Sequence, residues 1–124
     1  MPSTIAVIGA SADRTKFGNV CVRAYARAGW HVYPVNPKAD SIEGWPTFKS
    51  ISDIPPDSVD RVSVYLPALL GVKAMDEIAT KHVGEVWLNP GADDPAVVAK
   101  ARELGLNVVQ GCSIVAIGAS PAEF

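Results

Sequence analysis

The sequence predicts a single α/β domain in which helices cover both faces of a parallel β-sheet. Short apolar runs that end in glycine or proline alternate with stretches whose apolar residues recur at helical spacing. Strands that alternate with helices in this way pair in parallel and are buried on both faces. The chain has 124 residues, 48% of them hydrophobic, which suits one core and leaves no room for a second. We therefore treat residues 1–124 as one three-layer domain.

Six apolar runs are expected to form the strands of this sheet. They lie at residues 4–9, 30–35, 46–48, 61–66, 84–88 and 106–110. The third run is short and contains Pro46, which lacks the N–H that a central strand must donate, so we place it at an edge of the sheet. The rest of residues 37–60 is expected to form loops, with one helical turn between Ser50 and Ile54.

Three helices are expected between these strands. The first spans residues 17–28, because its apolar residues share one face of a helix. The second begins at Pro67, since proline is favoured in the first helical turn. The third begins at Pro95, after a capping aspartate that is either Asp93 or Asp94. We assign the apolar faces of all three helices to the core.

The charge balance and the cysteines restrict the class of partner. The formal net charge is −2, whereas nucleic-acid-binding domains carry a clustered positive excess, so we expect no nucleic acid partner. The first residues carry no basic stretch and lead into an apolar run too short for a signal peptide or a membrane span, which predicts a cytoplasmic protein without a membrane partner. Cys21 and Cys112 lack metal-ligand spacing, so we expect reduced thiols and no metal site.

The loop after the first strand is the strongest indication of a binding site. A buried strand that ends at Gly9 and leads through polar residues into a helix places backbone N–H groups and a helix N-terminus where a phosphate can bind. The dinucleotide-binding pattern G-x-G-x-x-G has two further glycines, but this chain has Ser11 and Arg14 there, with Lys16 just beyond. The sequence therefore predicts a phosphate site that uses side-chain cations as well as backbone N–H groups.

The end of the second strand indicates the kind of nucleotide. Ligands of parallel α/β sheets bind at the carboxyl ends of the strands, where an NAD-binding domain has an acidic residue for the ribose hydroxyls. This chain has Asn36 and Lys38 at that place. Lys38 alone would be interpreted as a solvated loop lysine, but beside Arg14 and Lys16 it favours a phosphate on the ribose. The residues therefore favour coenzyme A or NADP over NAD.

Four segments resemble the small stand-alone CoA-binding protein family, which is similar to the CoA-binding domain of the succinyl-CoA synthetase α subunit and of NDP-forming acyl-CoA synthetases. The resemblance covers nearly the whole chain and rests on residues 7–19, 32–38, 86–92 and 109–114, which include the strings Val35-Asn36-Pro37-Lys38 and Gly111-Cys112-Ser113-Ile114. It implies a Rossmann-like fold with strand order 3-2-1-4-5-6 and a coenzyme A site. It also implies that Ser11, Ala12 and Arg14 meet the pyrophosphate, that Lys38 lies near the phosphorylated ribose, and that residues 89–91 line the pantetheine side.

Three residues at strand ends have a structural alternative to a binding role. Pro67 offers an apolar ledge for an adenine face, or it only starts a helix. Asn89 can bond the amides of pantetheine, or it is a turn residue. Cys112 follows the sixth strand at the ligand edge, or it is a small buried hydrophobe. The candidate coenzyme-binding residues are Gly9, Ala10, Ser11, Ala12, Arg14, Lys16, Asn36, Lys38, Pro67, Asn89, Pro90, Gly91 and Cys112.

No catalytic constellation is evident, because His31 and His82 are expected away from the ligand edge. We therefore expect a module that binds coenzyme A or acyl-CoA without turnover, and a protein partner or a homo-oligomer stays open. One alternative is an NADP-linked oxidoreductase, which the missing glycines and the lack of a substrate domain oppose. The other is a detached subunit of an acyl-CoA ligase, which needs a partner chain with the nucleotide site and the phosphohistidine that the resemblance implies.

Overall fold

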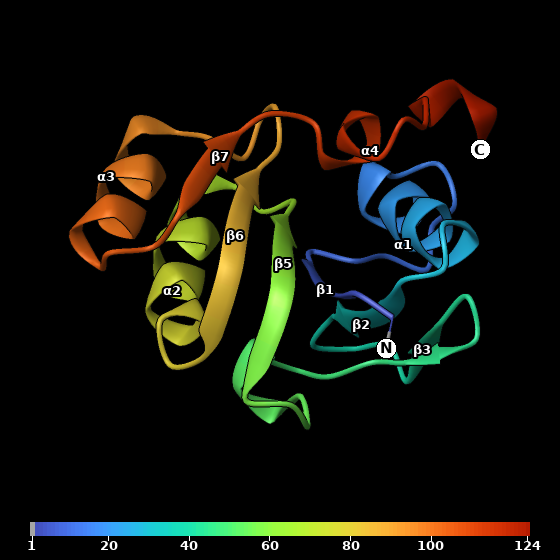
Figure 1. The fold of residues 1–124 in the computed structure, drawn as a ribbon, viewed down its shortest axis with the longest axis horizontal. Coiled ribbons are helices and arrows are strands. Elements are labelled where there is room, and N and C mark those ends of the chain that lie inside the picture. Colours follow the sequence, from blue (N-terminus) through green and yellow to red (C-terminus); the bar gives the residue numbers. More distant parts are fainter. Residues whose placement is uncertain (1) are drawn as a thin grey trace.

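A five-stranded parallel sheet forms the centre of the computed structural model, which describes residues 2–124 (Figure 1). The order of its strands is β2-β1-β5-β6-β7. The chain therefore moves from β1 to β2 on one side and then returns to the other side of β1, so that the order reverses between β1 and β5. The strands are β1 (Thr4–Ile8), β2 (His31–Val35), β5 (Ser58–Val64), β6 (His82–Leu88) and β7 (Val108–Gln110).

The expected order 3-2-1-4-5-6 is right for these five strands, whereas the expected strand at residues 46–48 does not form as such. Beside β2 the sheet continues only through one isolated parallel bridge, between Val35 and Phe48. The chain just before Phe48 forms an antiparallel hairpin instead, in which β3 (Ser41–Ile42) pairs with β4 (Trp45–Pro46). Its turn residues Glu43 and Gly44 both have positive φ, 51° and 82°, which is typical of two-residue hairpin turns. This hairpin was not predicted, and it leaves no room for a longer edge strand.

Helices cover both faces of the sheet, as predicted. Figure 1 shows α1 (Phe17–Arg27) on one side together with the short α4 (Ser113–Ala116), and α2 (Ala68–Ile78) and α3 (Pro95–Glu103) on the other. Asp94 caps α3 by accepting a hydrogen bond from the N–H of Ala96 at 2.9 Å. Pro67 precedes α2 as its N-cap rather than lying inside its first turn. The sequence did not predict α4, nor the 3-10 turn η2 (Pro121–Glu123), whereas the expected turn near residue 51 is η1 (Ile51–Asp53).

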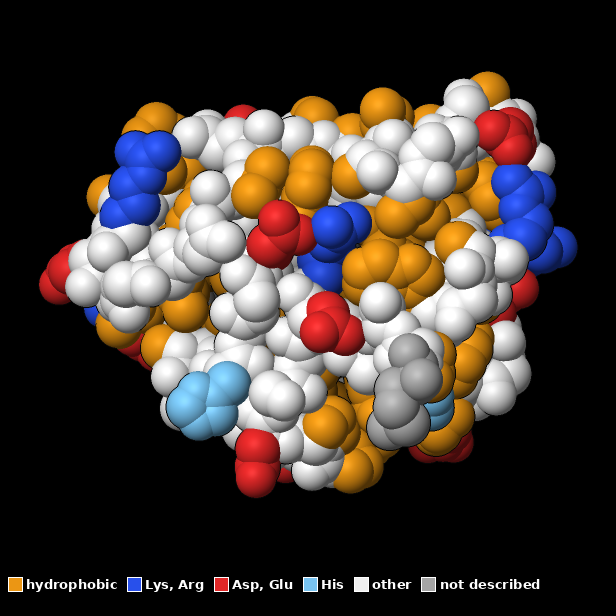
Figure 2. Space-filling view, viewed as in Figure 1, with side chains coloured by type: hydrophobic (Ala, Val, Ile, Leu, Met, Phe, Trp, Pro, Cys, Tyr) orange, Lys and Arg blue, Asp and Glu red, His pale blue; other side chains and the backbone are white. Residues whose placement is uncertain are grey.

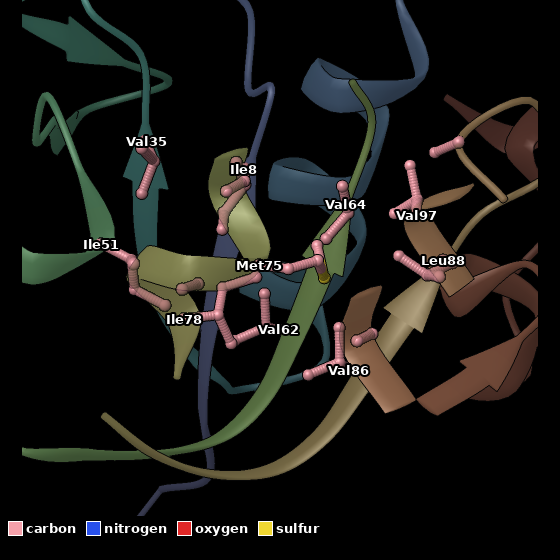
Figure 3. Close-up of a cluster of buried hydrophobic side chains, with 14 of the residues drawn as sticks. Ile8, Val35, Ile51, Val62, Val64, Met75, Ile78, Val86, Leu88 and Val97 are labelled. Carbon is pink, nitrogen blue, oxygen red and sulfur yellow. The ribbon is translucent and has the colours of Figure 1, made fainter. Parts of the chain in front are cut away.

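Two hydrophobic clusters, one on each face of the sheet, hold these layers together. Figure 3 shows the larger one, where Met75 and Ile78 of α2 lie beside Val62 of β5. The smaller one joins β1 to α1 and includes Cys21 and Tyr25, both fully buried. Strand β1 is thus buried from both sides, so its carboxyl end is a fixed platform for the loop that follows.

The face of the molecule seen in Figure 2 carries side chains of mixed type. Acidic and basic side chains are interspersed there among apolar ones, and no broad basic patch is present. Among residues 2–124 no helix combines the length and the apolar character needed to cross a membrane.

Candidate functional site

Two adjoining clefts lie at the carboxyl edge of the sheet, where the strand order reverses. The first has a volume of about 260 Å³ and lies over the ends of β1 and β2 against α2. The second, of about 290 Å³, lies between the start of α1 and the chain that leaves β5. Gly9 and Leu66 line both clefts, so the two form one continuous surface. A crevice at this point of an open parallel sheet is the usual ligand position in such folds.

Close backbone contacts at Gly9 and Gly18 build the wall between β1 and α1. Gly9 has φ 89°, and a Cβ atom there would lie 2.2 Å from the carbonyl oxygen of Tyr65. A Cβ atom on Gly18 would lie 2.2 Å from the carbonyl oxygen of Gly9. Gly18 therefore allows the close packing of helix on strand that the third glycine of the dinucleotide pattern allows, although this chain has Arg14 at the position of that glycine. Its signal in the sequence is a glycine in the first helical turn after the loop.

The loop from residue 10 to residue 16 is held by its own short side chains. Ser11 Oγ accepts a hydrogen bond from the N–H of Asp13 at 3.0 Å, and Asp13 accepts two from Thr15, at 2.7 Å from its hydroxyl and 3.0 Å from its N–H. The hydrogen bonds from the side chain and then the backbone of Thr15 lower the pKa of the Asp13 carboxyl. Helix α1 begins after Lys16 without a side-chain cap. Its first turn can therefore offer N–H groups to an anion in the second cleft, which Lys16 and Phe17 line.

Asn36 connects the end of β2 to this loop. Its Nδ2 donates to the carbonyl oxygen of Ala10 at 2.9 Å, and its Oδ1 accepts from the N–H groups of Lys38 at 2.8 Å and Ala39 at 2.9 Å. Asn36 and Ala10 both line the first cleft, so the structure brings these two candidates together with Gly9. The amide of Asn36 acts as a fixed brace between the two strand ends.

The cations at the first cleft differ from those that the sequence singled out. Lys38 is exposed and is not among the lining residues, whereas Lys49 and Lys73 are. Lys73 lies on the same side of α2 as Leu70 and Glu77, which also line the cleft. Neither lysine stands out in the sequence, because Lys49 lies in the irregular stretch and Lys73 follows the pattern of an ordinary solvated helix face. The predicted role of Lys38 stays a prediction.

The remaining candidates fall into three groups. Pro67 and Gly91 line the second cleft with Tyr65. Ala12, Arg14 and Pro90 are exposed at this edge outside both linings, and Arg14 forms an ion pair with Glu43. Asn89 is 1% exposed and turned into the protein.

Asn89 holds together the ends of β5 and β6 and the start of α4. Its Nδ2 donates to Ser63 Oγ at 2.9 Å and to the carbonyl oxygen of Val64 at 3.0 Å, and its Oδ1 accepts from the N–H of Ser113 at 2.8 Å. Ser63 Oγ and Ser113 Oγ lie 2.7 Å apart, and Tyr25 donates to the carbonyl oxygen of Ser113 at 2.7 Å. A hydrogen bond donated by Nδ2 of Asn89 to pantetheine would require one of its two internal bonds, to Ser63 or to Val64, to break. A contact between Asn89 and pantetheine stays a prediction, whereas its structural role is to join β5, β6 and α4.

The two cysteines lie in different environments. Cys21 is fully buried beside Ser63 and Ser113, and burial raises the pKa of its thiol. Cys112 is half-buried at the N-cap position of α4, next to the carboxyl edge. Both are free thiols.

A further cavity lies at the opposite edge of the sheet. This cavity, of about 590 Å³, lies at the amino ends of β5 to β7 and is lined by Asp60, Lys81 and His82 among others. His31 and His82 each start a strand at this edge, so they lie at the edge opposite the two clefts, as expected. In the part of the chain that the structure describes, no three His, Cys, Asp or Glu side chains gather to hold a metal ion.

The sheet, its switch-point clefts and the strand-loop-helix unit at Gly9 define a Rossmann-like α/β domain. The chain belongs to the CoA binding domain family, whose model matches residues 3–118. This agrees with the resemblance of the sequence.

Sequence and structure comparisons give the same family context. The chain is 36% identical over 97 residues to an ADP-forming acetate-CoA ligase I of Archaeoglobus fulgidus, covering 77% of this chain and 14% of that protein. It is 29% identical to the α subunit of the ADP-forming acetate-CoA ligase I of Pyrococcus furiosus, covering 98% of this chain and 29% of that subunit. A conserved hypothetical protein of Pyrococcus furiosus superposes with a TM-score of 0.82 at 26% identity, covering 94% of this chain and 99% of the other. The chain thus spans less than a third of the two ligase proteins and nearly all of the small one.

Proposed function

We propose that residues 1–124 form a domain that binds coenzyme A or acyl-CoA at the two adjoining clefts and does not itself turn the ligand over. The observation that carries this proposal is the combination of the family with a loop at the switch point of the sheet that leads into a helix start without a side-chain cap. The uncapped start of α1 and Lys16 suit a pyrophosphate, because they offer N–H donors and a positive charge in one place.

The chemistry of the clefts suits the remaining parts of the ligand. The first cleft pairs apolar walls, from Leu66 and Leu70, with the amide of Asn36, which suits an adenosine. Lys49 and Lys73 add positive charge at the same cleft, and Lys38 follows Asn36 closely in the loop. The second cleft is lined by Phe17 and Tyr65 together with glycines, which leaves a narrow, mainly apolar path for pantetheine. The ligand therefore meets local positive charge although the chain is slightly acidic.

The roles of Arg14 and Lys38 predict different losses of affinity. A well-formed charge-assisted phosphate contact contributes roughly 1.5–3 kcal/mol, or roughly 10- to 150-fold in Kd. Arg14→Ala should weaken CoA and dephospho-CoA alike, since both carry the pyrophosphate. Lys38→Ala should weaken CoA much more than dephospho-CoA, which lacks the 3′-phosphate. Isothermal titration calorimetry measures both, with Arg102→Ala on α3 as a control for loss of one exposed cation. Equal losses for the two ligands in Lys38→Ala would show that Lys38 does not bind the 3′-phosphate.

The absence of turnover is a second expected outcome. It is motivated by the clefts' lining, which contains no nucleophile paired with a base among the described residues, and by the place of His31 and His82 at the far edge. Purified protein incubated with ATP, CoA and a panel of carboxylic acids, or with acyl-CoA alone, should give no product by mass spectrometry. Thioester formation or hydrolysis that follows the protein through a further purification step would contradict the proposal.

A second candidate function is that of a detached subunit of an acyl-CoA ligase. It is supported by the relatives, since one of them is a ligase α subunit that extends well beyond this domain. In that case acyl-CoA formation should arise only when a partner chain supplies the nucleotide site. Stable co-purification of this chain with a nucleotide-binding ligase subunit would favour this function over a stand-alone binder.

A further inference from the structure

An acidic side chain from the β3–β4 hairpin contacts the proposed phosphate loop. Glu43 Oε2 lies 3.4 Å from Nε of Arg14 and accepts a hydrogen bond from Nδ2 of Asn19 at 3.2 Å. The Glu43 side chain is 25% exposed and that of Arg14 is 65% exposed. Glu43 has φ 51°, a conformation that a side chain of this kind rarely adopts. The hairpin therefore presents its carboxylate to the loop at some conformational cost.

The contacts around Glu43 continue into the loop. Asn19, fully buried, also donates to the carbonyl oxygen of Ser11 at 2.9 Å and accepts from Nε of Arg23 at 2.7 Å. Arg23 in turn donates to the carbonyl oxygen of Arg14 at 2.9 Å. The backbone of the loop is thus fixed by Asn19 and Arg23, whereas the guanidinium of Arg14 is held only on its Glu43 side by an exposed ion pair.

We infer that Glu43 competes with the ligand's phosphate for Arg14 and thereby sets the affinity of the site. The inference rests on the proposed function, in which Arg14 meets the pyrophosphate. A phosphate that binds the Nε edge of the Arg14 guanidinium must displace the carboxylate that pairs with it there. An ion pair this exposed is weak, and the pyrophosphate, which carries two negative charges in all, can therefore replace it. Removal of the Glu43 carboxylate removes this competition, so the ligand should bind more tightly.

The direct test is CoA binding to Glu43→Gln, which keeps the shape of the side chain and removes its charge. We expect CoA to bind about two- to fivefold more tightly at low salt, the range that exposed ion pairs contribute. Glu103→Gln, at the exposed end of α3, changes the net charge equally and should leave Kd unchanged. The gain should shrink at 0.5 M NaCl, because salt weakens ion pairs that are exposed to solvent. If the glutamine variant folds poorly, Glu43→Asn is the alternative, because asparagine tolerates positive φ. It should give the same gain in affinity.

A double-mutant cycle separates competition from a general charge effect. In an Arg14→Ala background, Glu43→Gln should give no gain, because no guanidinium remains to compete for. A gain of the same size in both backgrounds, a gain equal to that of Glu103→Gln, or weaker binding by folded Glu43 variants would each overturn the inference. If the wild-type protein binds CoA, any of these results overturns the inference alone and leaves the proposed function intact. No CoA binding by any variant would overturn the proposed function itself, and the inference with it.

Discussion

Gly18→Ala is expected to lower the free energy of unfolding by about 3 kcal/mol or more and to remove most of the CoA affinity. The added Cβ would lie 2.2 Å from the carbonyl oxygen of Gly9 and 3.1 Å from its carbonyl carbon, which are backbone atoms that no rotamer change can move. Helix α1 must therefore shift away from β1, and its N-terminus leaves the second cleft. Thermal unfolding should show a fall in Tm of roughly 10–15 °C for a domain of this size.

Gly111→Ala is the matched control at the same edge of the sheet. A Cβ there meets only the ring of Trp87, at 3.4 Å, and its backbone needs no positive φ. We expect its Tm to stay within a few degrees of wild type and its CoA affinity to be kept. A Gly18→Ala protein that is as stable as the control and binds CoA normally would show that the close contact between α1 and β1 does not position the site.

Asn89→Ala is expected to cost about 3 kcal/mol of stability. The change removes three hydrogen bonds and leaves the N–H of Ser113 and the carbonyl oxygen of Val64 without these partners in a dry interior. Each buried group left unsatisfied costs roughly 1–3 kcal/mol. Urea unfolding should show the loss as a lower midpoint at unchanged slope.

Asn107→Ala serves as the control for this amide. Asn107 also bonds a carbonyl oxygen, that of Gly84 at 3.0 Å, but it is exposed, so water can replace the bond. We expect a loss below about 1 kcal/mol for it. If Asn89→Ala lowered CoA affinity and left stability unchanged, Asn89 would be a ligand contact rather than the brace described here.

The sequence was sufficient for the parts of the fold that regular patterns encode. The strands β1, β2, β5, β6 and β7 appear where apolar runs end in glycine or proline, and the three long helices follow apolar residues at helical spacing. These signals are strong because each element buries one face or both in the core. The loop after Gly9 could be located for the same reason, since it follows a buried strand directly.

What the sequence could not provide depends on contacts between distant segments. The β3–β4 hairpin has only two residues in each strand, too few for a periodic pattern, and its turn puts Glu43 beside Arg14, 29 positions earlier. Lys49 and Lys73 line the same cleft although they lie 24 positions apart, one in a loop and one in α2. From the sequence, Asn89 could be interpreted as a turn residue or a ligand contact. Only its buried hydrogen bonds to Ser63 and Ser113 show that it connects the strand ends to α4.

Native mass spectrometry of the freshly purified protein tests the central claim most directly, because it reports the mass of a bound ligand and the assembly together. We expect a folded species that carries CoA or an acyl-CoA, or that gains one CoA mass per chain when CoA is added, and that releases this ligand on denaturation. NADP offered at the same concentration should bind much less. A protein that stays free of CoA, or that retains NADP in its place, would contradict the assignment of these clefts to coenzyme A.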